Sequence, residues 1–365
     1  MARVIISGGG TGGHVFPAIA IANALTAQQP DIELLFVGAS DRMEMEKVPA
    51  AGYEIIGLWI SGFQRSLSIR NLSFPFKLIH SMVKARNIVG SFKPDVVVGV
   101  GGYASGPMLK AAAGKGVPTL IQEQNSFAGV TNRLLAKNVE KICVAYEGMD
   151  RFFPADKIML TGNPVRKDIL DLQGKGDFGR SHFGLDENLK TVLAVGGSLG
   201  ARSINEGMGA SLDLFFESGF QVIWQTGSTY YKEAKQMAAD PGYQDRIKVF
   251  DFIRHMDYAY AVADVIISRA GAIAVSELCT VGKPVILVPS PYVAEDHQTK
   301  NAMALLDNNA ALLVRDSDTV SDLGEAAVGL LKDAERSREL SEQILKLAKV
   351  DAADVIAGEI LKMTQ

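Results

Sequence analysis

Short apolar runs alternate with longer segments of helical periodicity along the whole chain. The runs are rich in Val, Ile and Leu and are bounded by Gly, Pro or Asp, which is typical of parallel strands buried on both faces. Helical periodicity fills the gaps between them, for example at 14–28, 201–216, 271–281 and 321–332. We predict strands at 3–7, 32–37, 54–58, 95–99, 118–121, 141–144, 158–160, 190–195, 220–225, 247–250, 264–267, 284–288 and 311–314.

This alternation predicts an α/β fold with doubly wound parallel sheets, which bind ligands outside the carboxyl ends of their strands. At 365 residues the chain exceeds what one hydrophobic core usually supports, so we expect two domains. The turn at 161–165, Thr-Gly-Asn-Pro-Val, has the composition of a hinge. We therefore predict an N-terminal domain at 1–163 and a C-terminal domain at 164–339, with the final helical segment, about 340–365, packing back onto the first.

Two of the predicted strands run into glycine-rich turns that are each followed by a helix. The first turn holds five glycines between Gly8 and Gly13, together with Thr11 and His14, and the second is Gly-Gly-Ser-Leu-Gly at 196–200. Glycines let the backbone approach a ligand closely, and the N–H groups at the start of a helix attract anionic oxygens. The pattern predicts two nucleotide-type halves that face one cleft.

Further loops at predicted strand ends carry polar or small residues. They are 98–107, with its glycines and Tyr103, the polar run Gln-Glu-Gln-Asn at 122–125, the small-residue stretch 268–277, and the polar stretch 295–301. Buried polar side chains are costly unless something polar pairs with them. Each loop alone is equally well explained by a turn or a helix cap, but their coincidence at the expected rim favours a ligand site.

Composition places the chain among ordinary globular proteins, with 47% hydrophobic and 21% charged residues. We interpret the two cysteines, Cys143 and Cys279, as buried thiols in a reducing compartment rather than as a disulfide or metal site. The first glycine turn comes too early to leave room for a signal peptide, and no apolar run is long enough to span a bilayer. We therefore expect a cytoplasmic protein.

The net charge of −4 is unevenly distributed. No acidic residue occurs between Glu54 and Asp95, a stretch that also contains many apolar residues. An apolar stripe rimmed by cations suits an anionic membrane surface, although a core-facing helix with a solvated basic face accounts for the same pattern. Nucleic acid is not expected, because the whole chain is acidic and has no recognised nucleic-acid motif. The cations of the stretch are Arg65, Arg70, Lys77, Lys84, Arg86 and Lys93.

The ordered set of these motifs resembles the MurG family of bacterial glycosyltransferases over nearly the whole chain. The motifs are GGGTGGHVFPA, GVGGYASGP, QEQNSFAGVTNRLLAK, TGNPVR, GGSLGARSIN, SRAGAIAVSE and EDHQTKNA. The resemblance implies a two-domain GT-B fold and the transfer of N-acetylglucosamine from UDP-GlcNAc to undecaprenyl-linked muramyl-pentapeptide (lipid I), giving lipid II. It also implies a peripheral location on the cytoplasmic face of the cell membrane, with the acceptor on the N-terminal domain and the donor mostly on the C-terminal one.

The resemblance also implies roles for individual residues. Glu277 would hold the ribose diol and Gln298 the sugar hydroxyls. The loop at 98–107 lies at a predicted strand end, so we expect its residues Gly101, Gly102, Tyr103 and Ser105 to meet the acceptor or the diphosphate. Family members commonly have two adjacent glutamines where this chain has His297-Gln298, so the sugar contact at 297 stays open. The implied donor-binding residues are Thr11, Gly12, Gly13, Asn125, Arg166, Ser198, Ile253, Ala272, Ile273, Ala274, Val275, Ser276, Glu277 and Gln298.

The chemistry that these substrates require is an inverting displacement by the acceptor hydroxyl. We predict His14 as the base, because an imidazole titrates near neutral pH and its loop faces the expected cleft; the alternative is that it only positions the loop. The helix N-termini near Ser198 and Ala272, with Arg166, would stabilise the departing diphosphate without a metal or another cofactor. Asp316-Ser317-Asp318 spells a metal-binding D-x-D, but helix capping accounts for it better.

Other classes of function fit part of the pattern. Gly8, Gly10 and Gly13 satisfy the dinucleotide-binding spacing, yet the second predicted strand ends at 36–40 without the acid that would hold a ribose. Another UDP-sugar glycosyltransferase of GT-B fold, or a non-catalytic nucleotide-sugar-binding protein, would have the same pockets.

Overall fold

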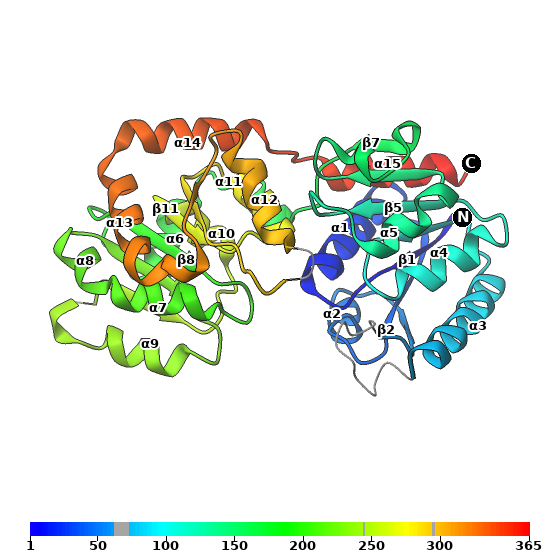
Figure 1. Cartoon of the computed structure of the whole chain (residues 1–365), viewed down its shortest axis with the longest axis horizontal. Helices are drawn as coiled ribbons and strands as arrows, with labels where there is room; N and C mark the ends of the chain where they lie inside the picture. The colour runs from blue at the N-terminus through cyan, green and yellow to red at the C-terminus, as the bar shows by residue number, and fades with distance from the viewer. Residues whose placement is uncertain (62–72, 244, 294–295) are drawn as a thin grey trace. The chain divides into compact units, whose positions relative to one another are not determined.

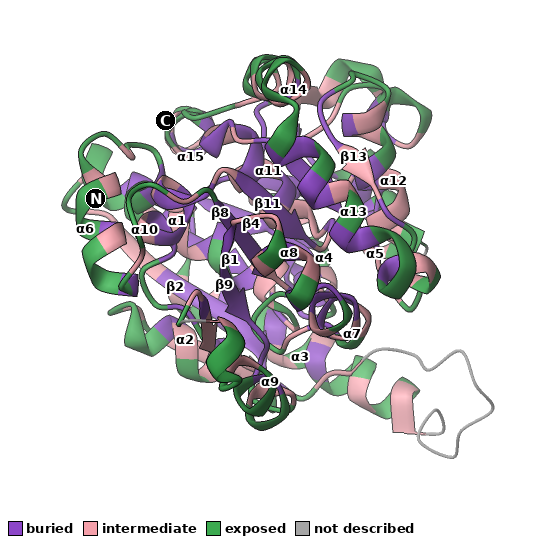
Figure 2. Ribbon diagram, turned by 90° about the vertical axis from the view of Figure 1, so that its left-hand side faces the viewer, coloured by how far each residue is buried: buried purple, intermediate pink, exposed green. Residues whose placement is uncertain are grey.

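The computed structural model describes residues 1–61, 73–243, 245–293 and 296–365, which form two compact units. Unit 1 comprises residues 1–165 and 349–365, and unit 2 comprises residues 166–348. Each unit is a parallel sheet covered by helices on both faces (Figure 1). Buried residues concentrate in the strands and on the helix faces turned toward them (Figure 2).

The sheet of unit 1 has seven parallel strands in the order β3-β2-β1-β4-β5-β6-β7. The first strand, β1, lies inside this sheet. Strands β2 and β3 are added on one side of it, and β4 to β7 are added on the other side. The order of the strands therefore reverses between β1 and β4, whose ends Ser7 and Gly99 lie in register. Loops that leave two such neighbouring strands in opposite directions open a crevice at the carboxyl edge. The strands are β1 (Arg3–Ser7), β2 (Glu33–Ala39), β3 (Ile55–Leu58), β4 (Val96–Gly99), β5 (Thr119–Glu123), β6 (Lys141–Val144) and β7 (Ile158–Leu160).

The helices of unit 1 pack on both faces of this sheet, each over its own core cluster. One cluster lies under α3 and α4, and the other under α1 and the C-terminal helix α15, which contributes Ile356, Ala357 and Ile360. The two faces are apolar because the Val and Ile side chains of each strand point alternately to both. The helices are α1 (Gly12–Gln28), α2 (Glu44–Ala50), α3 (Phe74–Phe92), α4 (Ser105–Ala113), α5 (Val130–Leu135) and α15 (Ala352–Met363).

Unit 2 repeats the design with six parallel strands in the order β10-β9-β8-β11-β12-β13. Its crevice lies between β8 and β11, whose ends Val195 and Ser268 lie in register. The strands are β8 (Thr191–Val195), β9 (Gln221–Gln225), β10 (Ile247–Phe250), β11 (Val265–Ser268), β12 (Val285–Leu287) and β13 (Leu312–Leu313). The helices are α6 (Lys175–Phe183), α7 (Arg202–Ala210), α8 (Leu212–Glu217), α9 (Tyr231–Ala238), α10 (Met256–Val262), α11 (Ala272–Val281), α12 (His297–Leu306), α13 (Thr319–Lys332) and α14 (Ala334–Lys346).

The predicted α/β fold with two doubly wound parallel sheets is confirmed, and every predicted strand is present with small shifts at its ends. The helix predicted at 201–216 was wrong as one element. It is divided at Ser211, whose hydroxyl donates to the Gly207 carbonyl at 2.7 Å. A serine that bonds the preceding turn in this way competes with the helical ladder.

The segment that returns to unit 1 begins at Lys349, later than the predicted start near 340. Helix α14 stays with unit 2 because Leu340 and Ile344 are fully buried, and Leu345 packs over Gly282 at the end of α11. Of the two C-terminal helices α14 and α15, only α15 belongs to unit 1.

Candidate active site

The loops after β1 and β4 meet backbone to backbone at the carboxyl edge of unit 1. The Gly9 N–H donates to the Gly101 carbonyl at 3.3 Å. Gly102 has a φ of +82°, and a Cβ at this position would overlap the Gly9 carbonyl. Both loops therefore need glycine for close approach as well as for conformation.

His14 lies in the first turn of α1, directly above this junction. Its Nδ1 is 3.1 Å from the Gly9 carbonyl oxygen and 3.2 Å from the Thr11 hydroxyl. A Cβ on Gly101 would come within 2.8 Å of Nε2, so the glycine makes room for the imidazole. Thr11, Gly12, Gly13 and His14 thus share one turn at the start of α1, beside the β4 loop.

The remaining residues of the β4 loop differ in exposure. Tyr103 is half exposed. Ser105, at the start of α4, is fully buried and donates its hydroxyl to the Gly102 carbonyl at 2.9 Å. Ser105 therefore holds the loop in shape, while Tyr103 is available to a ligand.

The polar run at the end of β5 is satisfied largely by the protein itself. Gln122 donates to Asn163 at 2.9 Å, Asn163 donates to the Gln124 carbonyl at 3.0 Å, and Gln124 donates to the Val100 carbonyl at 2.7 Å. Glu123 accepts from the Asn125 backbone N–H at 3.1 Å. The inference that these side chains need a bound ligand was therefore wrong for the three residues at 122–124. Asn125 stays a half-buried candidate.

In unit 2, the glycine loop after β8 is tied to the loop after β10 by a side chain that no sequence motif indicated. Gln225, at the end of β9, donates to the Gly197 carbonyl at 3.0 Å and accepts from the Ile253 N–H at 2.9 Å. Ser198 is exposed at the tip of this loop, whereas the Ile253 side chain is buried. Ile253 can therefore offer a ligand backbone atoms but little of its side chain.

The turn after β11 leads into the first turns of α11. Gly271 takes the N-cap position in an extended conformation, and Ala272, Ile273 and Ala274 follow half buried. Val275 is in contrast 1% exposed, so its side chain belongs to the core. A helix N-terminus built from small residues is suited to an anionic oxygen.

Glu277 lies one turn further and is held by two partners. Its carboxylate accepts from Arg166 Nε at 3.1 Å and from the Tyr260 hydroxyl of α10 at 3.2 Å, and the side chain is 13% exposed. Burial raises the pKa of the Glu277 carboxyl above its ordinary value, against the opposing charge of Arg166. Burial alone would lower the pKa of Arg166, but Glu277 and Asp168 raise it. No pattern in the sequence pointed to Tyr260.

Gln298 lies in the first turn of α12, where its side chain accepts from the Ser290 N–H at 2.8 Å. Ser276 donates to the Ala272 carbonyl at 3.1 Å within α11. Both side chains are half buried. A ligand that binds them would either replace these hydrogen bonds or form additional ones.

The D-x-D sequence forms neither a metal cluster nor a side-chain cap of the helix that follows. Asp316 pairs with Arg269 and accepts from Ser203. Asp318 occupies the N-cap of α13, but its carboxylate accepts from Ser317 rather than from a helix N–H. The capping interpretation was therefore wrong, and in the described residues no group of His, Cys, Asp and Glu could hold a metal ion.

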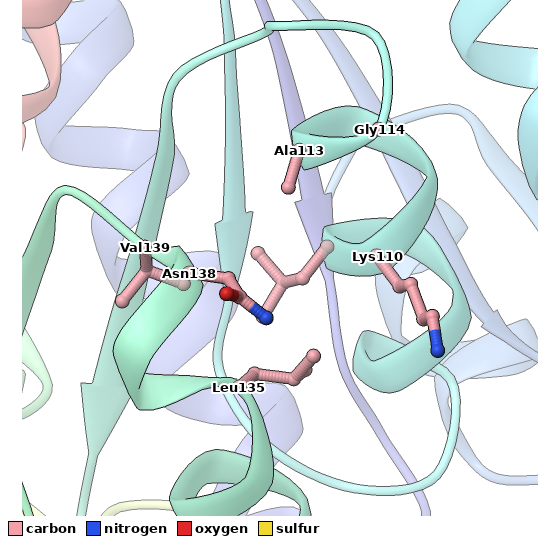
Figure 3. A pocket seen from close by; sticks show the side chains of 7 residues that line it. Lys110, Ala113, Gly114, Leu135, Asn138 and Val139 are labelled. Atoms are coloured by element: carbon pink, nitrogen blue, oxygen red, sulfur yellow. The ribbon is translucent and has the colours of Figure 1, made fainter.

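A groove of about 410 Å³ lies in unit 1 between α4 and the segment formed by α5 and the short helix η2 (Ala136–Asn138) (Figure 3). No residue predicted to bind substrate lines this groove, so it is separate from the candidate site. It is lined by Leu109, Lys110, Ala113, Gly114, Leu135, Asn138 and Val139.

Comparison with known proteins assigns both units to one family. The glycosyltransferase family 28 N-terminal domain matches residues 4–144, and the glycosyltransferase family 28 C-terminal domain matches residues 191–356. The crystal structure of Acinetobacter baumannii MurG is similar with a TM-score of 0.81 at 32% sequence identity, over 99% of this chain and 100% of that one. A UDP-GlcNAc 2-epimerase from Neisseria meningitidis shares the fold, with a TM-score of 0.69 at 15% identity, over 99% of this chain and 100% of that one.

Two curated relatives are named UDP-N-acetylglucosamine–N-acetylmuramyl-(pentapeptide) pyrophosphoryl-undecaprenol N-acetylglucosamine transferase. The protein from Parabacteroides distasonis is 57% identical over 99% of this chain and 98% of its own length. The protein from Cytophaga hutchinsonii is 56% identical over 99% of this chain and 96% of its own. The resemblance indicated by the motifs is confirmed: the chain belongs to glycosyltransferase family 28, as an N-acetylglucosamine transferase of the MurG type.

Proposed function

We propose that this enzyme transfers N-acetylglucosamine from UDP-GlcNAc to the C4 hydroxyl of the muramyl sugar in undecaprenyl-diphospho-muramoyl-pentapeptide, lipid I. The product is lipid II, a precursor of peptidoglycan. The observation that carries this proposal is the identity of more than half of all residues, over nearly the full chain, with relatives named for this transfer.

The donor binds mainly to unit 2. The first turns of α7 and α11 direct backbone N–H groups toward the diphosphate, with Ser198 in the loop before α7 and Ala272 at the start of α11. Arg166 is close enough to Glu277, at 3.1 Å, for one ligand to contact both, with the guanidinium on a phosphate and the carboxylate on the ribose diol. Backbone atoms of Ile253 meet the uracil, and Gln298 contacts the sugar hydroxyls.

The transfer itself is a single inverting displacement. The acceptor hydroxyl gives its proton to His14 as its oxygen forms a bond to the anomeric carbon, and the bond from that carbon to the UDP oxygen breaks. The α-linked donor thus gives a β-linked product. Nδ1 of His14 lies near the Gly9 carbonyl oxygen, which can only accept, and near the Thr11 hydroxyl, which can accept as well as donate. Hydrogen on Nδ1 suits both neighbours and leaves the lone pair on Nε2, where a base needs it.

The acceptor approaches unit 1 from the cytoplasmic face of an anionic membrane. Helix α3 exposes Phe76, Ile79 and Val83 instead of burying them, which favours the membrane surface over the core-facing interpretation. Of the cations on this helix, Arg86 is exposed, whereas Lys77 and Lys84 are half buried. The Lys77 amino group donates to the Ser61 hydroxyl and that of Lys84 to the Gly57 carbonyl. Arg65 and Arg70 lie outside the described residues. In the part of the chain that the structure describes, no helix is long and apolar enough to cross a bilayer.

Release of UDP with a soluble lipid I analogue tests the proposal. Wild-type enzyme should turn over with UDP-GlcNAc in preference to other UDP-sugars, and His14→Ala should lower turnover by ~10² to 10⁴ with donor binding nearly intact. Turnover with a different UDP-sugar would change the donor assignment. An unchanged rate in His14→Ala would remove His14 as the base, and UDP binding without any turnover would indicate a non-catalytic binding protein.

A further inference from the structure

A buried carboxylate without a role in the proposed transfer lies beneath the first glycine loop. Glu44, the first residue of α2, is 1% exposed. One of its oxygens accepts from the Gly10 N–H at 2.9 Å, and the other accepts from the Ala39 N–H at the end of β2, also at 2.9 Å. A single carboxylate thus bridges the loops after two neighbouring strands.

The backbone on both sides is shaped around this carboxylate. A Cβ on Gly9 would overlap the Glu44 carboxylate, and a Cβ on Gly38 would come within 2.5 Å of its Cγ. Because a buried charge is costly unless it is hydrogen-bonded, the two N–H donors are a necessary part of this arrangement. In a dinucleotide-binding fold this glycine loop would lie against a bound diphosphate. Here the Gly10 N–H donates its hydrogen bond to a carboxylate of the protein itself.

The contact reaches His14 through a single peptide group. The N–H that donates to Glu44 belongs to Gly10, and the carbonyl of the same peptide, that of Gly9, lies 3.1 Å from His14 Nδ1. A negative charge on the N–H side of a peptide polarises it and makes its carbonyl a stronger acceptor. The Glu44 carboxylate, the Gly9–Gly10 peptide and the imidazole therefore form one chain of hydrogen bonds.

We propose that Glu44 is a positioning residue for His14, acting through the Gly9–Gly10 peptide. It fixes the loop and favours the tautomer with hydrogen on Nδ1, so that Nε2 can accept the proton of the acceptor hydroxyl. The arrangement performs the task of the carboxylate that orients a catalytic histidine, with a peptide group inserted between the two. This inference rests on the proposed role of His14 as the base.

Nitrogen-15 NMR of histidine-labelled full-length protein tests the positioning without using activity. The chain has five histidines, and His14→Gln identifies the signal of His14. We expect the Nδ1–H tautomer in the wild type and a shift of about fivefold toward Nε2–H in Glu44→Gln, the change that one ordinary hydrogen bond produces. A wild-type His14 in the Nε2–H form, or a folded Glu44→Gln protein with an unchanged tautomer ratio, would overturn the proposal.

Kinetics then connects positioning to turnover. Glu44→Gln should lower kcat by up to about fivefold, in step with the tautomer shift, and leave KM for UDP-GlcNAc within about twofold. Glu44→Asp should recover part of the loss because it keeps the charge. Glu46→Gln is the matched control, since Glu46 lies on the same helix but is exposed and pairs with Lys47. A rise in KM at unchanged kcat would refute the role. If His14→Ala turns over normally, the proposed base is wrong, while the NMR result still decides the positioning.

Discussion

The replacement Glu277→Gln should separate recognition of the donor from stability of the fold. The carboxylate is 13% exposed and accepts from Arg166 and Tyr260 at 3.1 and 3.2 Å. Glutamine keeps the shape but has only one acceptor oxygen, so it cannot serve these two donors and a ribose diol. Losing a buried charged acceptor costs about 1 to 3 kcal/mol, so UDP affinity should fall by roughly 5- to 150-fold.

Stability should change much less, for a reason that follows from the sign of the pKa shift. Burial raises the folded-state pKa of Glu277 above the value in the unfolded chain. The contribution of Glu277 to folding stability is therefore fully present at a pH below the pKa of this residue in the unfolded chain. It is lost as pH rises through the higher pKa of the folded state. At pH 7 the ionised carboxylate already bears a burial cost that glutamine lacks. This gain offsets the lost hydrogen bonds, and Arg166 is not left buried without a partner, because its side chain is 36% exposed and keeps Asp168 at 3.8 Å. We therefore expect a change in unfolding free energy within about 1 kcal/mol.

Calorimetry with UDP and with its 2′-deoxy analogue tests the assignment directly. Wild-type protein should bind UDP more tightly than the analogue, and Glu277→Gln should bind the two almost equally. Glu325→Gln, an exposed change on α13, is the matched control. If Glu277→Gln keeps the wild-type preference for the 2′-hydroxyl, or binds UDP with unaltered affinity, the carboxylate does not hold the ribose.

Three further predictions concern unit 1 and the cysteines. Burial raises the pKa of both the Cys143 and the Cys279 thiol to about 12. Neither thiol should therefore react with a thiol reagent at pH 8 until the protein unfolds, and rapid labelling of the folded protein would contradict this. Lys141 and Lys362 lower the pKa of Glu359 on α15 in the folded protein. The ionised carboxylate therefore stabilises the fold at a pH above the pKa that Glu359 has in the unfolded chain, and this stabilisation is lost as pH falls through the lower pKa of the folded state. Glu359→Gln should destabilise unit 1 by about 1 to 3 kcal/mol at pH 7 and by less near pH 3, and an equal effect at both pH values in thermal unfolding would count against the ion pairs. Replacing the three basic residues of the α3 surface at 77, 84 and 86 with Glu should reduce sedimentation with anionic vesicles, whereas undiminished, salt-insensitive binding would argue against a membrane surface.

The sheets could be predicted well because buried parallel strands require continuous Val, Ile and Leu runs, which are visible locally. The glycine loops and His14 could also be located, since a cluster of glycines directly after a buried strand marks a place where the backbone must turn sharply or approach another group closely. The pairing of buried polar groups could not be predicted. Glu277 and Arg166 are 111 residues apart, and Glu44 and Gly10 are 34 apart. Those pairings depend on three-dimensional packing, which no local pattern encodes.

The C-terminal helix sets an order in which the chain can complete its cores. Unit 2 is one continuous segment, residues 166–348, and can bury its interior as soon as it has been synthesised. Unit 1 needs Ile356 and Ile360 of α15 to cover the apolar face of α1, although α1 is made long before α15. A growing chain therefore carries an uncovered hydrophobic helix until residues 352–363 have been made, and a chain that lacks α15 never covers it.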